Sequence, residues 1–324
     1  MNNELAHIAV FAFNRPQHLA RSLTALAGNQ LAQQSNVTVF CDAPRTDRDR
    51  TACDAVRGVA AKASGFSSVR VVPREENLGC ARSVITGLGE VFAEHDRVVV
   101  IEDDIVASPS TLTFLNRALD HYATAPCVFS IGAWVPPHKV VSPDYRYNAF
   151  FYPRFQCWGW ASWADRWAWN DWTVPGYDDY QQNSRLRQAH RLGGDDLPAM
   201  LDAQMAGKID SWAIRAEYTR FRFGAVTVYP RTSLVANIGM DGTGRHAAAT
   251  TRYDSVVGGT FDIDVWPFPD HVYLDREIVA AFRRMYAPAS LLSRIGRRLQ
   301  RVFSRSAGWW PEAPRNFTRL DSDS

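Results

Sequence analysis

Cysteine is scarce in this 324-residue sequence, and its positions fit neither a disulfide framework nor a zinc site. There are five cysteines, an odd number, and no two of them have the CxxC spacing of metal or redox motifs. Scattered, unpaired thiols are typical of a reducing compartment. The five are Cys41, Cys53, Cys80, Cys127 and Cys157.

Long apolar runs and a dominant charge are also lacking. No stretch reaches the roughly 18 apolar residues that a membrane-spanning helix needs, and residues 1–4 lack the basic start of a signal peptide. The 36 Lys and Arg nearly balance the 34 Asp and Glu, so no global field attracts nucleic acid. We therefore expect a cytoplasmic globular protein without a nucleic-acid partner.

Three consecutive carboxylates, Glu102, Asp103 and Asp104, follow the apolar run 98–101. Charges this close repel one another unless a cation or several donors compensate them. Mg²⁺ and Mn²⁺ prefer oxygen ligands and keep positions open for a substrate phosphate. The alternative is a solvated acidic loop that helps to cap a helix beginning near 108–110. The triplet alone leaves both interpretations open.

The first half of the chain alternates between apolar runs and helical segments. We expect strands at 7–13, 37–40, 69–72 and 98–101, and helices at 16–27, 47–63 and about 79–93. This spacing predicts a parallel sheet with helices on both faces, which binds ligands beyond the carboxyl ends of its strands. Asn14-Arg15, Cys41-Asp42 and the carboxylate triplet all fall at those ends, so three polar clusters converge on one edge.

Tryptophan is concentrated in one part of the second half. Six of the eleven tryptophans lie between positions 158 and 172, namely Trp158, Trp160, Trp163, Trp167, Trp169 and Trp172. Large aromatic residues dominate core burial, yet aromatic walls with a few polar groups also hold small ligands. We expect most of these side chains to pack and one or two to face a substrate.

Two later segments carry further candidates. Asp210 lies between apolar neighbours, a setting that suits a general base, although a helix N-cap is the more economical interpretation of Asp210-Ser211. The stretch 237–246 is glycine-rich and ends in donors, so it could close over a phosphate or form a surface turn. Its candidate residues are Gly242, Gly244, Arg245 and His246.

Several of these segments occur together in a familiar order. They are Phe13-Asn14-Arg15-Pro16, Asn77-Leu78-Gly79, Val100-Ile101-Glu102-Asp103-Asp104, Trp158-Gly159-Trp160-Ala161-Ser162-Trp163 and Ile209-Asp210-Ser211-Trp212. Over about residues 6–250 the chain resembles bacterial nucleotide-sugar glycosyltransferases of the GT-A fold, and more distantly the N-acetylglucosaminyltransferase I and protein O-mannose N-acetylglucosaminyltransferase group. The triplet is a generic DxD-type motif, whereas its combination with the tryptophan segment and Asp210 is specific.

The resemblance implies an α/β fold with a Rossmann-like, mostly parallel sheet flanked by helices and an acceptor-side mixed subdomain. Residues 1–125 would bind the nucleotide sugar, 126–286 would form the acceptor-binding and catalytic half, and 287–324 a basic C-terminal helix and tail. The implied reaction is metal-dependent, inverting transfer from a nucleoside-diphosphate sugar, expected to be a UDP-sugar, to a hydroxyl of a glycan or glycolipid. Mn²⁺ or Mg²⁺ is the implied cofactor, and cell-surface polysaccharide synthesis is the implied setting.

The resemblance also implies roles for single residues. On the donor side, Asp104 matches the residue that binds the metal directly, and Asp103 matches one that contacts the metal or the donor ribose. Glu102 matches a residue near the nucleoside. Arg15 and Asp42 match residues that contact the base and phosphate of the donor nucleotide. Arg82 stands where eukaryotic relatives have a histidine that contacts the nucleotide, so the identity of the donor's nucleotide base stays open. Asp210 matches the catalytic base, although relatives often read Trp-Asp-x-Trp and Ile209 precedes it here. Trp158, Gly159, Trp160 and Trp212 fall on the acceptor side.

Two other classes of protein share part of this pattern. A sugar nucleotidyltransferase also combines a parallel sheet with a carboxylate-held metal, but its first strand usually leads into a glycine-rich basic loop. Here that place reads Phe13-Asn14-Arg15-Pro16, without glycine. A non-catalytic carbohydrate-binding protein would explain the tryptophans, but it would not need carboxylates at a sheet edge.

The segment 288–305 has a basic amphipathic pattern outside the resemblance. Its apolar positions (291, 292, 295, 299, 302 and 303) fall within an arc of roughly 120°, arginines at 294, 297, 298, 301 and 305 occupy the adjoining arc, and Trp309-Trp310 follow. An anionic membrane surface attracts such a helix, which would place the protein on the inner face of the cytoplasmic membrane. Docking of the helix on the catalytic domain is the alternative.

Overall fold

The computed structural model describes residues 4–242, 250–255, 257 and 267–287. The compact unit Met1–Tyr286 contains all but one of them. The predicted amphipathic segment 288–305 lies outside the described residues, and so do Gly244, Arg245 and His246. None of the helices in the described ranges combines the length and the apolar character that crossing a bilayer requires.

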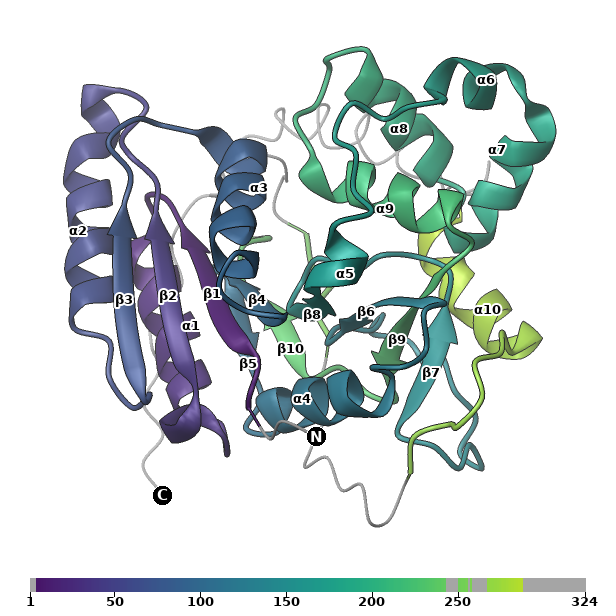
Figure 1. Ribbon diagram of the computed structural model, residues 1–324, viewed down its shortest axis with the longest axis horizontal. Helices are drawn as coiled ribbons and strands as arrows, with labels where there is room; N and C mark the ends of the chain where they lie inside the picture. Colours follow the sequence, from purple (N-terminus) through teal and green to yellow (C-terminus); the bar gives the residue numbers. More distant parts are fainter. Residues whose placement is uncertain (1–3, 243–249, 256, 258–266, 288–324) are drawn as a thin grey trace, which may run out of the picture. The chain divides into compact units, whose positions relative to one another are not determined.

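An eight-stranded sheet forms the centre of this unit, in the order β3-β2-β1-β4-β8-β6-β9-β7 (Figure 1). Its strands are β1 (His7–Ala12), β2 (Asn36–Cys41), β3 (Ser68–Pro73), β4 (Arg97–Glu102), β6 (Val128–Gly132), β7 (Ala149–Tyr152), β8 (Trp160–Trp163) and β9 (Val226–Pro230). The first four strands pair in parallel, as the sequence predicts. The other half is mixed, because β8 runs antiparallel to both β4 and β6, and β7 antiparallel to β9.

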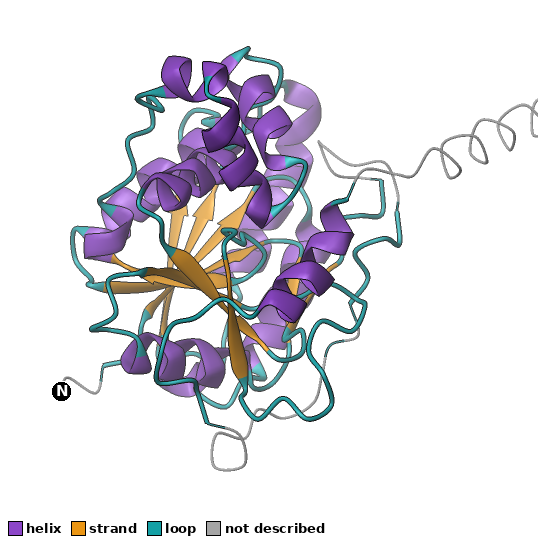
Figure 2. Cartoon of the chain, turned by 90° about the vertical axis from the view of Figure 1, so that its right-hand side faces the viewer, coloured by secondary structure: helices purple, strands orange, loops and turns teal. Residues whose placement is uncertain are grey.

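Helices cover both faces of the sheet (Figure 2). The α-helices of the described residues are α1 (Pro16–Ala27), α2 (Arg50–Ala61), α3 (Gly79–Phe92), α4 (Thr111–His121), α5 (Ala164–Trp167), α6 (Tyr177–Gln182), α7 (Ser184–His190), α8 (Leu197–Met205), α9 (Trp212–Arg222) and α10 (Arg276–Arg283). The expected helix at 47–63 is a 3₁₀ turn at Asp47–Asp49 followed by α2.

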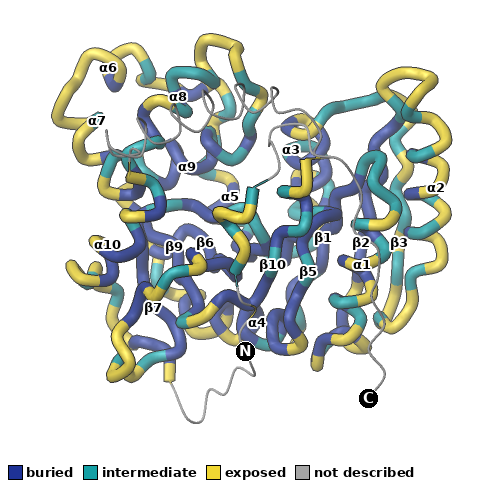
Figure 3. Tube along the Cα trace, turned by 180° about the vertical axis from the view of Figure 1, so that it is seen from behind, coloured by how far each residue is buried: buried dark blue, intermediate teal, exposed yellow. Residues whose placement is uncertain are grey.

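The alternation of side chains along β1 builds the two layers of the core. Ile8 and Val10 pack in the same cluster as residues of α1, α2 and α4, whereas Ala9 and Phe11 pack in the cluster that contains residues of α3 and α9. Successive residues of a strand point to opposite faces, so a strand buried on both faces reads as a continuous apolar run. Except for the edge strand β3, the strands of the central sheet are accordingly deeply buried, while α2, α6 and α7 present exposed surfaces (Figure 3).

A separate antiparallel pair joins distant parts of the chain. β5 (Ile105–Ala107) pairs with β10 (Val235–Asn237), so Ile105 stands opposite Asn237. The backbone N–H of Ile238 also donates to the carbonyl oxygen of Asp104 at 2.9 Å. This pairing brings the residues after β10 against Asp103 and Asp104, which form the acidic turn that follows β4.

The tryptophans of the 158–172 segment mostly pack. Trp160, Trp163 and Trp167 are buried, whereas Trp158, Trp169 and Trp172 are half-buried and lie against the core clusters. The Trp160 ring lies 5.7 Å from that of Trp212, measured between centroids.

Candidate active site

A cleft of about 510 Å³ opens at the carboxyl ends of β1, β2 and β4. Its size is that of a small-molecule site, for which about 300–1,000 Å³ is usual. The described residues that line it are Phe11, Ala12, Phe13, Asn14, Arg15, Asp42, Arg45, Asn77, Gly79, Cys80, Ser83, Val84, Glu102, Asp103, Asp104, Trp158, Asn237, Gly239 and Met240. The three polar clusters predicted to converge on this edge of the sheet therefore do so.

A second cavity, of about 420 Å³, lies beside the loop 135–143 and Arg231. The described residues of its lining include no Asp or Glu and none of the site residues predicted from the sequence. The chemistry-bearing residues gather in the larger cleft, so we place the candidate active site there.

Arg15 offsets part of the negative charge of the acidic turn, which consists of Asp103 and Asp104. It follows β1, and its Nη2 donates to Oδ1 of Asp103 and, at 2.9 Å, to Oδ2 of Asp104. The backbone N–H of Phe13 donates to the other oxygen of Asp103 at 3.4 Å. Asp104 Oδ1 is buried, and it has no hydrogen-bond partner among the residues that the structure describes.

Burial changes the protonation of the other two carboxyl groups. It raises the pKa of Glu102 to about 8, and the neighbouring charges of Asp104 and Asp103 add to the effect. Burial also raises the pKa of Asp103, to about 6, because the Arg15 guanidinium offsets the effect only in part. Without a further cation, Glu102 is therefore mainly protonated at neutral pH.

A hard divalent cation fits this turn if the phosphate of a bound substrate supplies some of its oxygen ligands. Within the described ranges, no cluster of three or more His, Cys, Asp or Glu side chains could hold a metal ion. The unpartnered oxygen of Asp104 nevertheless offers a buried anionic ligand, and Mg²⁺ typically binds one or two carboxylates together with substrate phosphates and water. The residues thus suit a cation held jointly by the protein and a phosphate, not by the protein alone.

Gly239 allows the chain after β10 to approach the turn closely. A Cβ atom at this position would lie 2.0 Å from Asp104 Oδ2 and 2.8 Å from Arg15 Nη1, both far inside contact distance. Any other residue would displace the carboxylate or the guanidinium. The 237–246 stretch therefore contributes to the site through Asn237, Gly239 and Met240, whereas Gly242 is described but does not belong to the cleft lining.

Asp42 lines the cleft, but its carboxylate is engaged by the segment that begins α3. Its two oxygens accept from the backbone N–H groups of Ala43, Leu78 and Gly79 at 2.9–3.0 Å and from Asn77 Nδ2 at 3.1 Å. Asp42 therefore joins the end of β2 to the start of α3. The donor contact that the resemblance implies for it stays a prediction.

Other predicted residues lie outside the cleft lining. The Arg82 side chain is 63% exposed and pairs with Glu76. Trp160 and Trp212 are buried in the core. Gly159 has a positive φ of 65°, and a Cβ there would lie 3.1 Å from Val235, so it permits close packing against β10.

Asp210 immediately precedes the N-cap of α9. Its side chain is 50% exposed, its Oδ1 lies 3.9 Å from Arg215 Nη2, and it is not among the described residues that line the cleft. Ser211 is the N-cap of the helix, because its Oγ accepts from the N–H of Ile214 at 3.3 Å. Asp210 is thus not used as a cap, and its role as a base stays a prediction.

Trp158 is the tryptophan of its segment that reaches the cleft. Its ring packs edge-on against Trp134 and Tyr253, at centroid distances of 4.9 and 5.4 Å. Sequence reasoning missed Trp134, because a lone tryptophan at the end of a strand has no distinguishing pattern. It also missed Arg45 and Cys80, which line the cleft without belonging to a motif.

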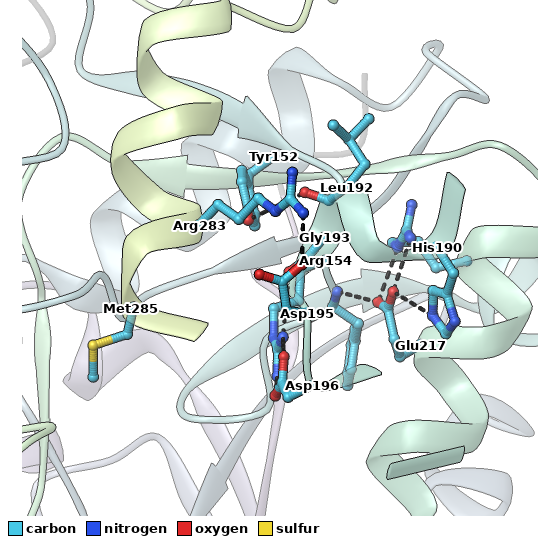
Figure 4. A network of polar contacts seen from close by, with 12 residues as sticks. Tyr152, Arg154, His190, Leu192, Gly193, Asp195, Asp196, Glu217, Arg283 and Met285 are labelled. Carbon is cyan, nitrogen blue, oxygen red and sulfur yellow. Dashed lines mark hydrogen bonds and ion pairs between the residues drawn. The ribbon is translucent and has the colours of Figure 1, made fainter. Parts of the chain in front are cut away.

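A buried polar network supports the chain that leads to Trp158 (Figure 4). Glu217 of α9 accepts from the N–H of Phe155 at 2.5 Å and from Nε and Nη2 of Arg220 at 2.9 and 2.8 Å. His190 Nε2 lies 3.4 Å from the same carboxylate. Arg154 forms two hydrogen bonds with Asp196, at 2.8 and 2.9 Å. The segment before Trp158 is therefore fixed on α9 and on the loop after α7.

The chain matches one protein family over its first half. Residues 6–148 match the family model described as "Glycosyltransferase like family 2". Together with the observed sheet, this match confirms the predicted α/β fold of the GT-A type.

Two solved structures are distantly similar. The crystal structure of S. aureus TarS is 17% identical, over 46% of this chain and 25% of that one, with a TM-score of 0.30. A crystal structure of an active-site mutant of LgtC is 14% identical, over 77% of this chain and 84% of that one, with a TM-score of 0.38. The chain spans about a quarter of the length of the TarS chain.

Proposed function

We propose, from the premise that residues 6–148 are a glycosyltransferase family 2-like domain, that this protein moves a sugar from a nucleoside-diphosphate donor to a hydroxyl group of a glycan or glycolipid. The reaction depends on Mn²⁺ or Mg²⁺, and cell-surface polysaccharide synthesis is its setting. The observation that supports the proposal most is the buried, unpartnered oxygen of Asp104 in a cleft at the carboxyl edge of the sheet. A UDP-sugar is the expected donor by resemblance.

The residues of the cleft suit a nucleotide sugar. Arg15 and Arg45 supply cationic donors for a diphosphate, Asn14 and Asn77 supply neutral hydrogen-bonding groups, and Trp158 supplies an aromatic wall. Asp104 and Asp103 would hold the divalent cation. When bound, that cation offsets the negative charge that develops on the leaving diphosphate.

The chemistry is a single displacement at the anomeric carbon. The acceptor oxygen forms a bond to this carbon as the bond to the diphosphate oxygen breaks, and the bonding electrons leave with the diphosphate. The acceptor oxygen attacks from the face of the sugar opposite the diphosphate, so the anomeric configuration inverts. Asp210 takes the proton of the acceptor hydroxyl on that face. Arg15 and Arg45 orient the leaving group during this step.

A binding screen of nucleotide sugars with and without Mn²⁺ tests the proposal. By calorimetry, at least one donor is expected to bind in the presence of Mn²⁺ and to lose most of its affinity in EDTA. Asp104→Asn should remove the Mn²⁺-dependent part of the affinity. Asp178→Asn, the same change at an exposed position of α6, is the matched control and should behave as the parent.

The products then separate the three classes of protein. Sugar transfer to an acceptor, or slow hydrolysis of the donor, supports the glycosyltransferase. Pyrophosphate formation would identify a nucleotidyltransferase instead. Binding of glycans without any affinity for nucleotides would leave only a carbohydrate-binding protein.

We also propose that residues 288–305 attach the protein to anionic membranes, on the basis of their sequence pattern. The full chain is then expected to float with liposomes that contain anionic phospholipids and to remain unbound with zwitterionic ones, because the arginines need negative headgroups. A chain that ends at residue 287 should bind neither. Equal flotation of the two chains would disprove membrane attachment through this segment.

A further inference from the structure

Arg15 occupies the acidic turn in the way that a bound cation would. Its side chain is only 21% exposed, and a single nitrogen, Nη2, contacts oxygens of both Asp103 and Asp104. Its backbone is fixed as well, because Arg15 precedes Pro16 at the start of α1 and its carbonyl oxygen accepts from Leu19 N–H at 3.0 Å. Arg15 is thus held at both ends, at its backbone by the first turn of α1 and at its guanidinium by Asp103 and Asp104.

We infer that Arg15 is an internal counter-ion, which holds the two metal-binding carboxylates in the free protein and gives them up when a donor diphosphate arrives with a divalent cation. This inference rests on the proposed function, since it concerns the same cation and the same donor. It adds a role that the resemblance does not assign to Arg15: the residue determines how tightly the free protein binds metal.

Arg15 and a divalent cation cannot share the turn as it stands. A cation that bound both carboxylates would meet the positive guanidinium, which already uses Asp104 Oδ2 and Asp103 Oδ1. The loop at Gly239 closes this side, because even a Cβ atom there would lie 2.8 Å from Arg15 Nη1. Of the four carboxylate oxygens of Asp103 and Asp104, Asp104 Oδ1 is the one without a hydrogen bond among the described residues. One oxygen is a weak site for a cation that prefers several.

A diphosphate resolves this competition. It gives the released guanidinium a bidentate anionic partner in the same cleft, and it supplies the oxygens that the cation lacks. Cation and nucleotide should therefore each increase the affinity for the other, and by the same factor, since such coupling is reciprocal. Couplings between two sites commonly amount to about 5–150-fold.

Titration of the protein with Mn²⁺, followed by the electron paramagnetic resonance signal of free Mn²⁺, measures this role without turnover. For the parent, UDP is expected to increase the Mn²⁺ affinity by about 5–150-fold. For Arg15→Gln, the affinity without nucleotide should rise, and the increase caused by UDP should shrink accordingly. Arg15→Lys keeps the charge but loses the forked geometry, so it should fall between the two.

Arg45→Gln is the matched control. Arg45 lines the same cleft but lies over the Phe13 ring, 5.5 Å from its centroid. Its removal changes the charge of the cleft by the same amount. If both glutamine variants bind Mn²⁺ equally well without nucleotide, the effect is general electrostatics and the counter-ion role is refuted.

The outcomes separate this inference from the proposed function. If the parent binds Mn²⁺ with UDP while Arg15→Gln leaves the metal affinity of the free protein unchanged, only the counter-ion role fails. If no form binds Mn²⁺ with UDP or GDP, both fail. Circular dichroism establishes whether each variant folds. If Arg15→Gln does not fold, Arg15→Lys replaces it in the test. The counter-ion role is then refuted if Arg15→Lys binds Mn²⁺ without nucleotide no more tightly than the parent does.

Discussion

Asp210→Asn is expected to bind the nucleotide sugar with the parent's affinity and to transfer sugar about 10²–10⁴-fold more slowly, the usual effect of removing a general base. The amide has the shape of the carboxylate but cannot accept the proton of the acceptor hydroxyl. Donor affinity should persist because Asp210 is not among the described residues that line the cleft. Calorimetry with the donor and transfer rates at saturating donor measure the two effects separately.

Asp178→Asn provides the control for this variant, since Asp178 is an exposed aspartate of α6. The N-cap of α9 should also survive in Asp210→Asn, because Ser211 supplies it. An equal loss of rate in both variants would indicate a general effect of charge. Transfer by Asp210→Asn at the parent rate would show that another group takes the proton.

Glu217→Ala is expected to destabilise the fold by about 3–5 kcal/mol, the cost of breaking a buried ion pair from one side. Glu217 and Arg220 are each only 3% exposed. In this variant the Arg220 guanidinium stays buried without its anionic partner, the removed side chain leaves a cavity, and the N–H of Phe155 loses its acceptor. Urea unfolding followed by tryptophan fluorescence gives the free energy of unfolding.

Asp202→Ala is the comparison for Glu217→Ala. Asp202 also forms two hydrogen bonds with an arginine, Arg187, at 2.9 and 2.7 Å, but its side chain is 33% exposed. Its loss should cost only about 0–1 kcal/mol. If the two variants lose the same stability, burial of the Glu217 network is not what stabilises the fold.

The same network should make stability depend on pH. Burial alone would raise the pKa of Glu217, but Arg220 and His190 outweigh it and lower this pKa to about 2. Because the unfolded carboxyl has the higher pKa, its contribution is complete above about pH 4.5 and is lost as the pH falls towards 2. Burial lowers the pKa of His190, so this residue also destabilises the fold as the pH falls below about 6.5. Glu217→Gln should therefore lose less stability on acidification than the parent.

The sequence predicts the first half of the fold well because local signals determine it. The apolar runs of β1 and β4 are continuous, that of β2 is interrupted only by Thr38, and each ends at polar residues that mark the edge of the sheet. Those signals also located the cleft. The mixed parallel and antiparallel pairing of β6 to β9 could not be predicted, since it depends on how short strands pair over long separations.

The partners of the site residues were equally out of reach. Arg15 and Asp103 are 88 positions apart and meet only because β1 pairs with β4. An aspartate at a strand end can contact a ligand or bind the next helix, and the arrival of Leu78 and Gly79 engages Asp42 in the second way. Glu217 and Arg220 have the i, i+3 spacing of an ordinary exposed pair, and only tertiary packing buries them.

The pairing of β5 with β10 limits how the proposed glycosyltransferase could acquire specificity for a different donor. One wall of the cleft comes from positions before 105, and the other from Trp158, Asn237, Gly239 and Met240. The second wall lies beyond the segment 6–148 that matches the family model. An exchange of that segment between relatives would therefore import the first wall of the cleft and place it opposite a second wall from another protein. Specificity in this architecture should diverge through substitutions on both walls together, and not through recombination of whole modules.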